Sequence, residues 1–226
     1  MVLTALMAFI SSGIFAQTYF SMSAGAGGLF SYGSNFGAKD EFKNSIGYRN
    51  LSFGGSAYFD ATFAELGLNY AYGLLTNVAE VNNFSLKGDM GSVNQIGFSF
   101  LLKVPFYPFK KDSINVKKSS FAIFPLMGFD CYWGFSYKKG KDNFYGGNLT
   151  REIRAGDFNQ FGFLAGAGFD LTITGPLYLR TEVLYRHVFG SKLGKDLAKE
   201  NDMRQSIPVS ICTKICIGVK VWDPKF

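Results

Sequence analysis

The residues best suited to chemistry are charged side chains that recur at every second position of one segment. Arg180, Glu182 and Arg186 occupy even positions between Leu177 and Val188. Residues two apart in an extended strand point to the same face, so one face of this segment carries charges of both signs. Buried charges must pair, and we expect a shared interior network. The same phase in other segments adds its remaining members, which are Glu65, Lys103, Asp130, Asp170, Lys214 and Lys220.

A nucleophilic set is the second chemistry to consider. His187 is the only histidine, Ser191 follows four residues later, and Glu182 lies on the same segment. A serine, a base and an acid can together support acyl hydrolysis. His187 and Ser191 span a predicted junction of strand and loop, and a lone histidine at a rim is more often structural. The sequence therefore predicts no catalytic residue.

The three cysteines predict neither a disulfide framework nor a metal site. Cys212 and Cys216 lie four apart on one predicted strand, which separates their Cα atoms by about 13 Å. A disulfide needs Cα atoms within about 7 Å. With one histidine in the chain, zinc ligands are lacking. No metal and no cofactor are expected.

The elements that position these residues show a period of two. Apolar and polar residues alternate in eight segments, and the apolar face of each lacks Asp, Glu, Lys and Arg. These segments are residues 18–32, 51–60, 64–74, 95–106, 121–137, 160–171, 177–188 and 209–221. Such alternation predicts an all-β fold, an eight-stranded antiparallel up-and-down transmembrane barrel.

The apolar faces indicate contact with lipid. The chain has 25 Phe and 27 Gly among 226 residues, with only 18 % charged residues. A soluble sandwich is the alternative, but the polar faces carry Gly and Ser instead of a charged exterior, and the segments exceed the usual ~5–6 residues. Met127, Trp133 and Tyr137 are also expected on the lipid side. The predicted lipid-facing residues are Phe20, Phe53, Leu68, Phe98, Phe100, Phe129, Phe163, Val183, Ile215 and Ile217.

The segments and their connections predict one domain. Residues 1–16 are typical of a signal peptide, and residues 17–226 would form the barrel. Long polar loops are predicted at 33–50, 76–93, 138–159 and 189–207, with shorter links between them. Long loops on one side and short turns on the other are typical of outer-membrane barrels.

With its strands placed, the chain resembles the small eight-stranded outer-membrane proteins of the OmpA, OmpX and OmpW type. The resemblance rests on the alternating segments, the loop asymmetry and the aromatic residue Phe226. It implies a final strand read by the outer-membrane assembly machinery, with Trp222 and Phe226 as the signal. Pro224 departs from that pattern because proline cannot donate to a strand ladder.

These patterns predict a non-enzymatic surface protein of the bacterial outer membrane. Its partners would be outer-membrane lipid, the assembly machinery, and host or surface ligands bound by the four loops. A nucleic-acid partner is not expected, because the formal charge of +6 includes no basic run. A narrow porin or OmpW-like channel is the first alternative, since inward glycines could leave space in the lumen. A lipid A-modifying enzyme is the second alternative.

Overall fold

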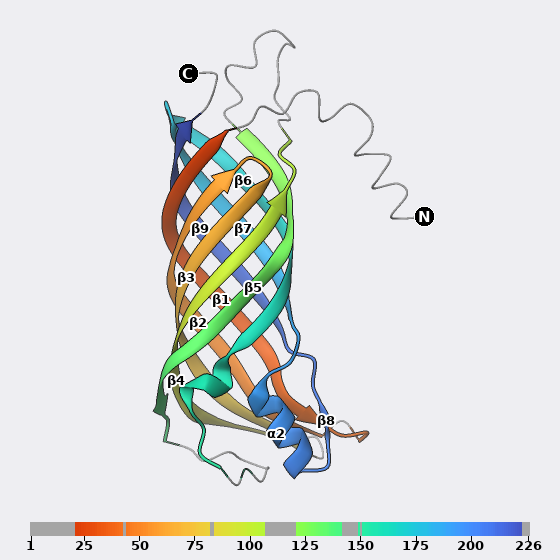
Figure 1. Ribbon diagram of the computed structural model, residues 1–226. Helices are drawn as coiled ribbons and strands as arrows, with labels where there is room; N and C mark the ends of the chain where they lie inside the picture. The colour runs from red at the N-terminus through yellow and green to blue at the C-terminus, as the bar shows by residue number, and fades with distance from the viewer. Residues whose placement is uncertain are drawn as a thin grey trace, which may run out of the picture.

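The computed structural model describes residues 21–42, 44–81, 84–106, 121–141, 149 and 151–222. In these ranges the chain forms a closed antiparallel barrel of eight long strands (Figure 1). The strands are β1 (Met22–Lys39), β2 (Ser45–Ala61), β3 (Ala64–Val81), β4 (Phe84–Lys103), β5 (Phe121–Lys139), β6 (Gln160–Thr174), β7 (Leu177–Val188) and β9 (Val209–Trp222). The predicted eight-stranded up-and-down architecture is confirmed.

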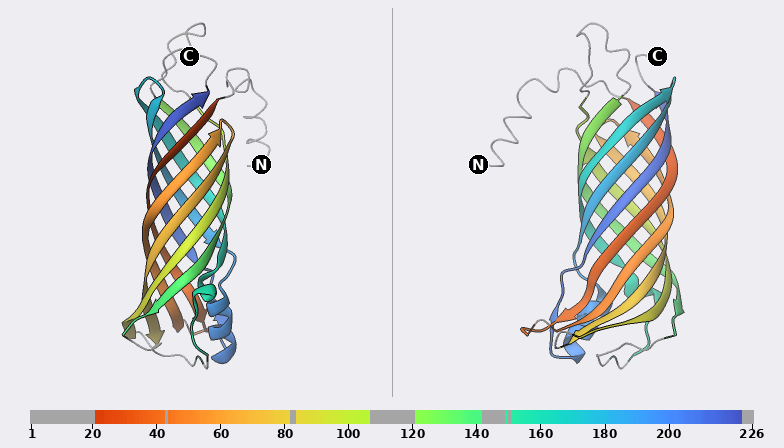
Figure 2. Two further views of the ribbon diagram at one scale, coloured as in Figure 1. Left: turned by 60° about the vertical axis from the view of Figure 1, so that its left-hand side comes forward. Right: turned by 180° about the vertical axis from the view of Figure 1, so that it is seen from behind.

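The barrel closes because its first and last long strands pair. Each long strand pairs with its neighbour in the sequence, and β9 pairs with β1 from Met22↔Trp222 to Ser34↔Val209. A short strand, β8 (Arg204–Gln205), adds to the far end of β1. The start of β1 and the end of β9 lie at one end of the barrel, called here the termini end (Figures 1 and 2).

The opposite end, called here the α2 end, carries the two short helices of the described ranges. These are the 3-10 helix η3 (Ala155–Phe158) and the helix α2 (Lys192–Glu200), which lie together at the barrel mouth (Figure 2). The Ser191 side chain caps α2 by accepting a hydrogen bond from the Gly194 amide at 2.9 Å. No helix in the described ranges is long and apolar enough to cross a membrane.

The alternation in the sequence becomes an apolar belt on the outside of the barrel. The predicted lipid-facing residues Phe53, Leu68, Phe98, Phe100, Phe129, Val183, Ile215 and Ile217 all point outward and are 41–56 % exposed. Phe163 is half-buried between its neighbours, and its ring packs against Phe129 with centroids 5.6 Å apart. Trp222 is exposed at the end of β9. Phe20, Phe226 and the predicted signal peptide lie outside the described residues.

The strands continue much further than the alternation predicts, and the loops assigned to residues 33–50 and 76–93 are wrong in extent. β1 continues to Lys39, and β2 begins at Ser45. Likewise, β3 continues to Val81, and β4 begins at Phe84. A strand of 18 residues, tilted by about 40°, spans about 45 Å, whereas the apolar band of such a barrel is about 25 Å tall. The hairpins of the α2 end therefore extend beyond the belt.

Local irregularities interrupt the alternation where the strands extend. The register shifts between Gly33 and Phe36 in β1 and between Leu75 and Thr76 in β3. An extra residue in one strand reverses which side chains face inward, so the apolar alternation breaks although pairing continues. Beyond the shift in β1, the apolar residues Phe36 and Ala38 face inward and are buried.

A third irregularity corrects the prediction for Tyr137. The pairing of β4 with β5 shifts at Asn94↔Ser136 and Gln95↔Gly134, which leaves Phe135 as the extra residue. Past this bulge the side chain of Tyr137 turns inward, where its hydroxyl donates to the Met90 carbonyl at 2.7 Å. Trp133, before the bulge, faces outward as predicted.

The segments predicted as loops at 138–159 and 189–207 contain ordered structure as well. β5 ends at Lys139, η3 lies in the first segment, and α2 and β8 lie in the second. Leu193, Leu197 and Ala198 form the buried face of α2, at the spacing of one side of a helix. The helix has only nine residues, too few for its periodicity to stand out against the strand pattern.

Candidate functional site

Side chains fill the interior of the barrel in successive layers, and the inward residues of β7 pass through each layer in turn. The inward side chains of β7 pass from an ionic layer at the termini end, through an apolar layer, to a second ionic layer and an apolar layer at the α2 end. In that order they are Tyr178, Arg180, Glu182, Leu184, Arg186 and Val188, all buried. An eight-stranded barrel has an interior that side chains can fill, so each layer can close the lumen.

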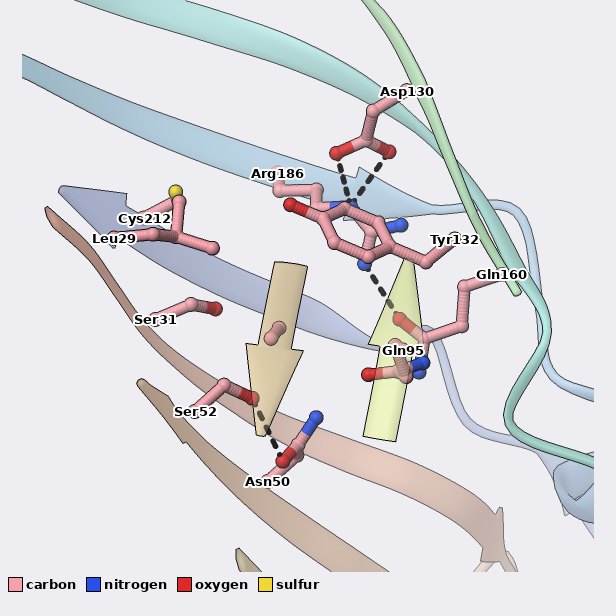
Figure 3. Close-up of a pocket in the computed structure, with 11 residues that line it drawn as sticks. Leu29, Ser31, Asn50, Ser52, Gln95, Asp130, Tyr132, Gln160, Arg186 and Cys212 are labelled. Carbon is pink, nitrogen blue, oxygen red and sulfur yellow. Dashed lines mark hydrogen bonds and ion pairs between the residues drawn. The ribbon is translucent and has the colours of Figure 1, made fainter. Parts of the chain in front are cut away.

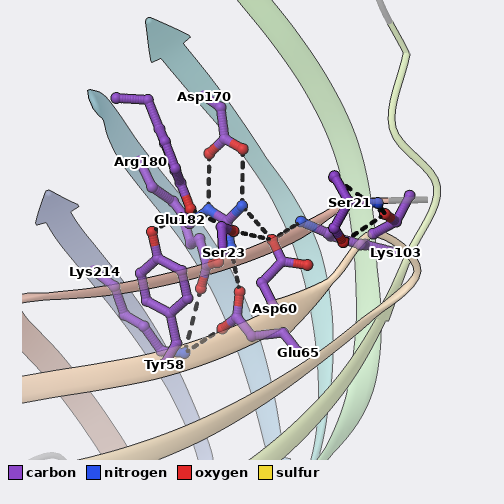
Figure 4. Close-up of polar contacts among 12 residues, drawn as sticks. Ser21, Ser23, Tyr58, Asp60, Glu65, Lys103, Asp170, Arg180, Glu182 and Lys214 are labelled. Carbon is purple, nitrogen blue, oxygen red and sulfur yellow. Dashed lines mark hydrogen bonds and ion pairs between the residues drawn. The ribbon is translucent and has the colours of Figure 1, made fainter. Parts of the chain in front are cut away.

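The ionic layer nearest the termini end, called here the ion cluster, is organised by Arg180 (Figure 4). Its Nε and Nη2 atoms donate to the two Asp170 oxygens at 2.7 and 2.8 Å. Nη1 donates to Glu65 Oε2 at 2.7 Å, and Nη2 also donates to Asp60 Oδ2 at 2.6 Å. The guanidinium lies over the ring of Tyr58, 4.5 Å from its centroid. A planar fork of donors suits this geometry, which one lysine could not reproduce.

Two lysines complete the ion cluster. Lys214 Nζ lies 3.2 Å from Glu182 Oε2 and 3.5 Å from Glu65 Oε1. Lys103 pairs with Asp60. Asp60 and Glu65 are directly opposite on β2 and β3, where like charges repel unless cations lie between them. Arg180 contacts both carboxylates and so offsets that repulsion.

Aromatic rings fill the space that glycines leave in the lumen. A Cβ added at Gly25 or Gly218 would collide with the Tyr58 hydroxyl, and one added at Gly97 would collide with the Tyr132 ring. The Tyr58 hydroxyl donates to the Tyr178 oxygen, which in turn donates to Ser23 Oγ, each at 2.8 Å. The expectation that inward glycines leave open space is therefore wrong at Gly25 and Gly97.

The second ionic layer is a single buried pair in the middle of the lumen (Figure 3). Arg186 Nε lies 2.7 and 2.8 Å from the two oxygens of Asp130, and Nη1 donates to Gln160 Oε1 at 2.6 Å. The guanidinium lies 5.0 Å from the centroid of the Tyr132 ring. A small cavity adjoins this pair. The pair carries no net charge, which limits what the cavity could hold.

The layer at the α2 end, called here the apolar plug, closes the mouth. Side chains of the strand ends meet the buried face of α2 and the Phe158 ring of η3, which contacts Tyr48 with centroids 5.6 Å apart. The members of the plug are Phe36, Ala38, Ile46, Tyr48, Leu75, Met90, Val93, Phe158, Val188, Leu193, Leu197 and Ala198.

An ionic clasp holds η3 against α2 above the plug. Arg151 donates to Asp157 Oδ2 at 2.6 Å and also pairs with Asp196 on α2. Burial raises the pKa of the Asp157 carboxyl, but hydrogen bonds from Arg151 and from the Arg154 amide more than offset it, so this pKa lies below its ordinary value. The carboxylate form of Asp157 therefore stabilises the closed mouth.

The structure brings together most of the predicted charge network and adds one member to it. Glu65, Lys103, Asp170, Arg180, Glu182 and Lys214 meet in the ion cluster, whereas Asp130 and Arg186 form the separate central pair. The added member is Asp60, which shares the even positions of its segment with Ser52 and Ser56 and therefore faces the lumen as they do. Lys220 lies beyond Gly218 on β9, half-exposed near the termini end and outside the buried cluster.

The serine, histidine and acid considered for catalysis do not meet. His187 faces outward, and its ring lies 5.6 Å from that of Phe189. Ser191 is buried as the cap of α2, and Glu182 points into the lumen. In the described part of the chain, no group of three or more His, Cys, Asp or Glu residues could hold a metal ion.

Comparison with solved structures identifies the architecture. The outer-membrane protein OprG of Pseudomonas aeruginosa superimposes with a TM-score of 0.51 at 14 % sequence identity, over 90 % of this chain and 97 % of OprG. The chain has the fold of a small outer-membrane β-barrel. Neisserial surface protein A (NspA) matches 90 % of this chain and 99 % of its own at 11 % identity, with a TM-score of 0.46. No family model and no curated protein matches the sequence.

The shared fold and the apolar belt together make this chain an outer-membrane barrel protein. A belt of outward Phe, Leu, Ile and Val side chains would be unfavourable in water and is what a bilayer requires of a barrel. At 14 % identity the likeness to OprG concerns the fold alone.

Proposed function

We propose that this chain is a closed, non-conducting barrel that displays its α2 end outside the outer membrane as a surface protein. The observation that carries the proposal is the lateral bridge of Arg180, which links β7 to Glu65 on β3 and Asp60 on β2. An arginine held by three carboxylates blocks the axis at one layer. The apolar plug blocks it again at the α2 end.

These two barriers argue against the narrow-channel alternative. An ion crossing the apolar plug would lose its water without gaining polar partners, which is costly in a low-dielectric interior. An ion crossing the cluster would have to displace carboxylates that already hold Arg180 and Lys214. A cavity between them, lined by described residues, has a volume of only about 30 Å³.

The display role is supported by the strands that extend beyond the apolar belt. Phe42 in the β1–β2 turn, and Phe84 and Leu86 at the β3–β4 hairpin, are 86 %, 76 % and 52 % exposed. Large apolar side chains at a hairpin tip are typical of surfaces that contact other molecules. Lys192, Lys195 and Lys199 line the exposed face of α2 at the same end of the barrel. The barrel would thus be a rigid mount for a contact surface.

Solute uptake by proteoliposomes tests the closed lumen. Vesicles containing the folded barrel should swell in an isosmotic solution of a small neutral sugar no faster than protein-free vesicles. A gel of the same vesicles, loaded cold and after boiling, shows through the shift in migration that the barrel is folded. Swelling that increases with the amount of folded barrel would contradict the proposal.

Labelling in intact cells tests the display separately. A Lys195→Cys variant places a thiol on the exposed face of α2, and Thr174→Cys places one at the exposed last residue of β6, at the termini end. A membrane-impermeant maleimide should label Lys195→Cys and leave Thr174→Cys unlabelled until the cells are opened. Cys212 and Cys216 are buried, and the partly exposed Cys131 is replaced by serine in both variants so that little background labelling remains. The reverse labelling pattern would contradict the proposed orientation.

A further inference from the structure

The cavity in the middle of the lumen has a polar wall formed by side chains from several strands (Figure 3). Arg186, Gln160 and Asp130 lie on one side, with Ser31 and Cys212 across from them, and Ala71 also belongs to the wall. The cavity lies in the lumen, between the ion cluster and the apolar plug. A polar cavity in such a place is a candidate binding site.

Two buried donors lie in this wall without an acceptor in good hydrogen-bond geometry among the described residues, although the buried Tyr48 hydroxyl lies near the Gln160 amide. They are Arg186 Nη2 and Gln160 Nε2, and both side chains are more than nine-tenths buried. The other nitrogens of Arg186 and the carbonyl oxygen of Gln160 are engaged with each other and with Asp130. A buried donor without an acceptor costs about 1–3 kcal/mol, so an occupant that accepts hydrogen bonds would stabilise the barrel.

The charge and size of the cavity select the occupant. Asp130 and Arg186 are the two charged residues of the wall, and they balance one another. An added anion would leave an uncompensated negative charge, and an added cation would face the Arg186 guanidinium. The volume of about 30 Å³ exceeds the ~10–15 Å³ that one water molecule needs, and it is too small for an organic solute.

We propose that this cavity is a water-binding site in which one or two ordered water molecules accept hydrogen bonds from Arg186 Nη2 and Gln160 Nε2. A water molecule can accept from both donors and donate onward to neighbouring oxygens. The water thereby completes a transverse polar layer made of Asp130, Arg186 and Gln160. This inference does not depend on the proposed surface role, because it concerns only how the central pair is satisfied.

A crystal structure of the full barrel, grown with bromide as the halide, tests the occupant directly. We expect solvent density within hydrogen-bond distance of Arg186 Nη2 and Gln160 Nε2, without anomalous signal at the bromine edge. Anomalous density there would show an anion and overturn the proposal. An empty cavity, or a rotated Gln160 or Arg186 that satisfies both donors within the protein, would overturn it equally.

Two substitutions of equal volume at Ala71 give an independent test in solution. Ala71 is buried in the cavity wall, and Ala71→Val and Ala71→Thr add side chains of the same shape. Both displace water, but the threonine hydroxyl can accept a hydrogen bond in its place. We expect Ala71→Val to lower the thermal midpoint more than Ala71→Thr does. A dry cavity predicts the opposite order, since valine would then fill it without burying a hydroxyl, and that result would overturn the proposal.

Discussion

Arg180 on β7 donates a 2.7 Å hydrogen bond to Glu65 on β3, a strand four places away in the ring of eight. The two residues therefore join opposite walls of the barrel directly through its axis. Neither strand hydrogen-bonds to the other through its backbone. Side chains alone hold this cross-section shut, and the ion cluster contributes to stability as well as to closure.

Replacing Arg180 with methionine should destabilise the barrel by about 3–5 kcal/mol, because Asp60 and Glu65 would lose the guanidinium that lies between them. Urea unfolding in detergent, followed by the shift in gel migration, measures the difference. Arg49→Met is the matched control, since Arg49 pairs with Glu80 at 3.7 Å in an exposed position and should change stability by less than about 1 kcal/mol. Equal losses in the two variants would contradict the role assigned to Arg180.

Gly218→Ala should cost about 1–3 kcal/mol, because the added methyl group would collide with the Tyr58 hydroxyl and with the ring and hydroxyl of Tyr178. Gly28→Ala is the control on the lipid face, where a Cβ would meet nothing within 4 Å. That substitution should be neutral or stabilise by up to about 1 kcal/mol, since alanine restricts the unfolded chain. Thermal unfolding of the two variants compares them. A neutral Gly218→Ala would show that the rings do not fill the lumen.

Asp157→Asn should destabilise the α2 end in a pH-dependent way. The pKa of Asp157 is lower in the folded chain than in the unfolded chain, so its carboxylate stabilises the fold above the unfolded value of about 3.9. This contribution is lost as the pH falls through the lower, folded value. The thermal midpoint of the variant should thus lie below that of the parent at pH 7, and the gap should narrow below about pH 4. A gap that is independent of pH would contradict the clasp.

The sequence predicts the barrel and much of its charge network because both follow from a period of two. Phe98 and Phe100 alternate with Ser99, and a strand can satisfy that alternation only by presenting one face to lipid and the other to the lumen. Arg180 and Glu182 share the inward phase for the same reason. The carboxylates that Arg180 contacts lie on strands β2, β3 and β6. Their distance from Arg180 depends on how the barrel closes, and no local sequence pattern predicts it.

The α2 end was less predictable because its apolar residues face inward after irregular positions. Phe36 follows the register shift of β1, and Tyr137 follows the bulge at Phe135. Each shift depends on how two strands pair, so it has no signature within one segment. Ser191 is a typical helix cap. Helix α2, however, has only nine residues with a single buried face, too few for its periodicity to predict a helix within a polar segment. The alternation therefore predicts longer loops than the structure has.

Single-channel recording in a planar bilayer tests the closed lumen most directly. The folded barrel, verified by its cold and boiled migration, should give no steady ionic current in 1 M salt (roughly the condition in which exposed charges are most screened). The barrel is delivered in vesicles that fuse with the planar bilayer. Insertion is checked by recovering folded barrel from that bilayer. Steady current steps of one reproducible size, scaling with the amount of folded barrel, would contradict the account.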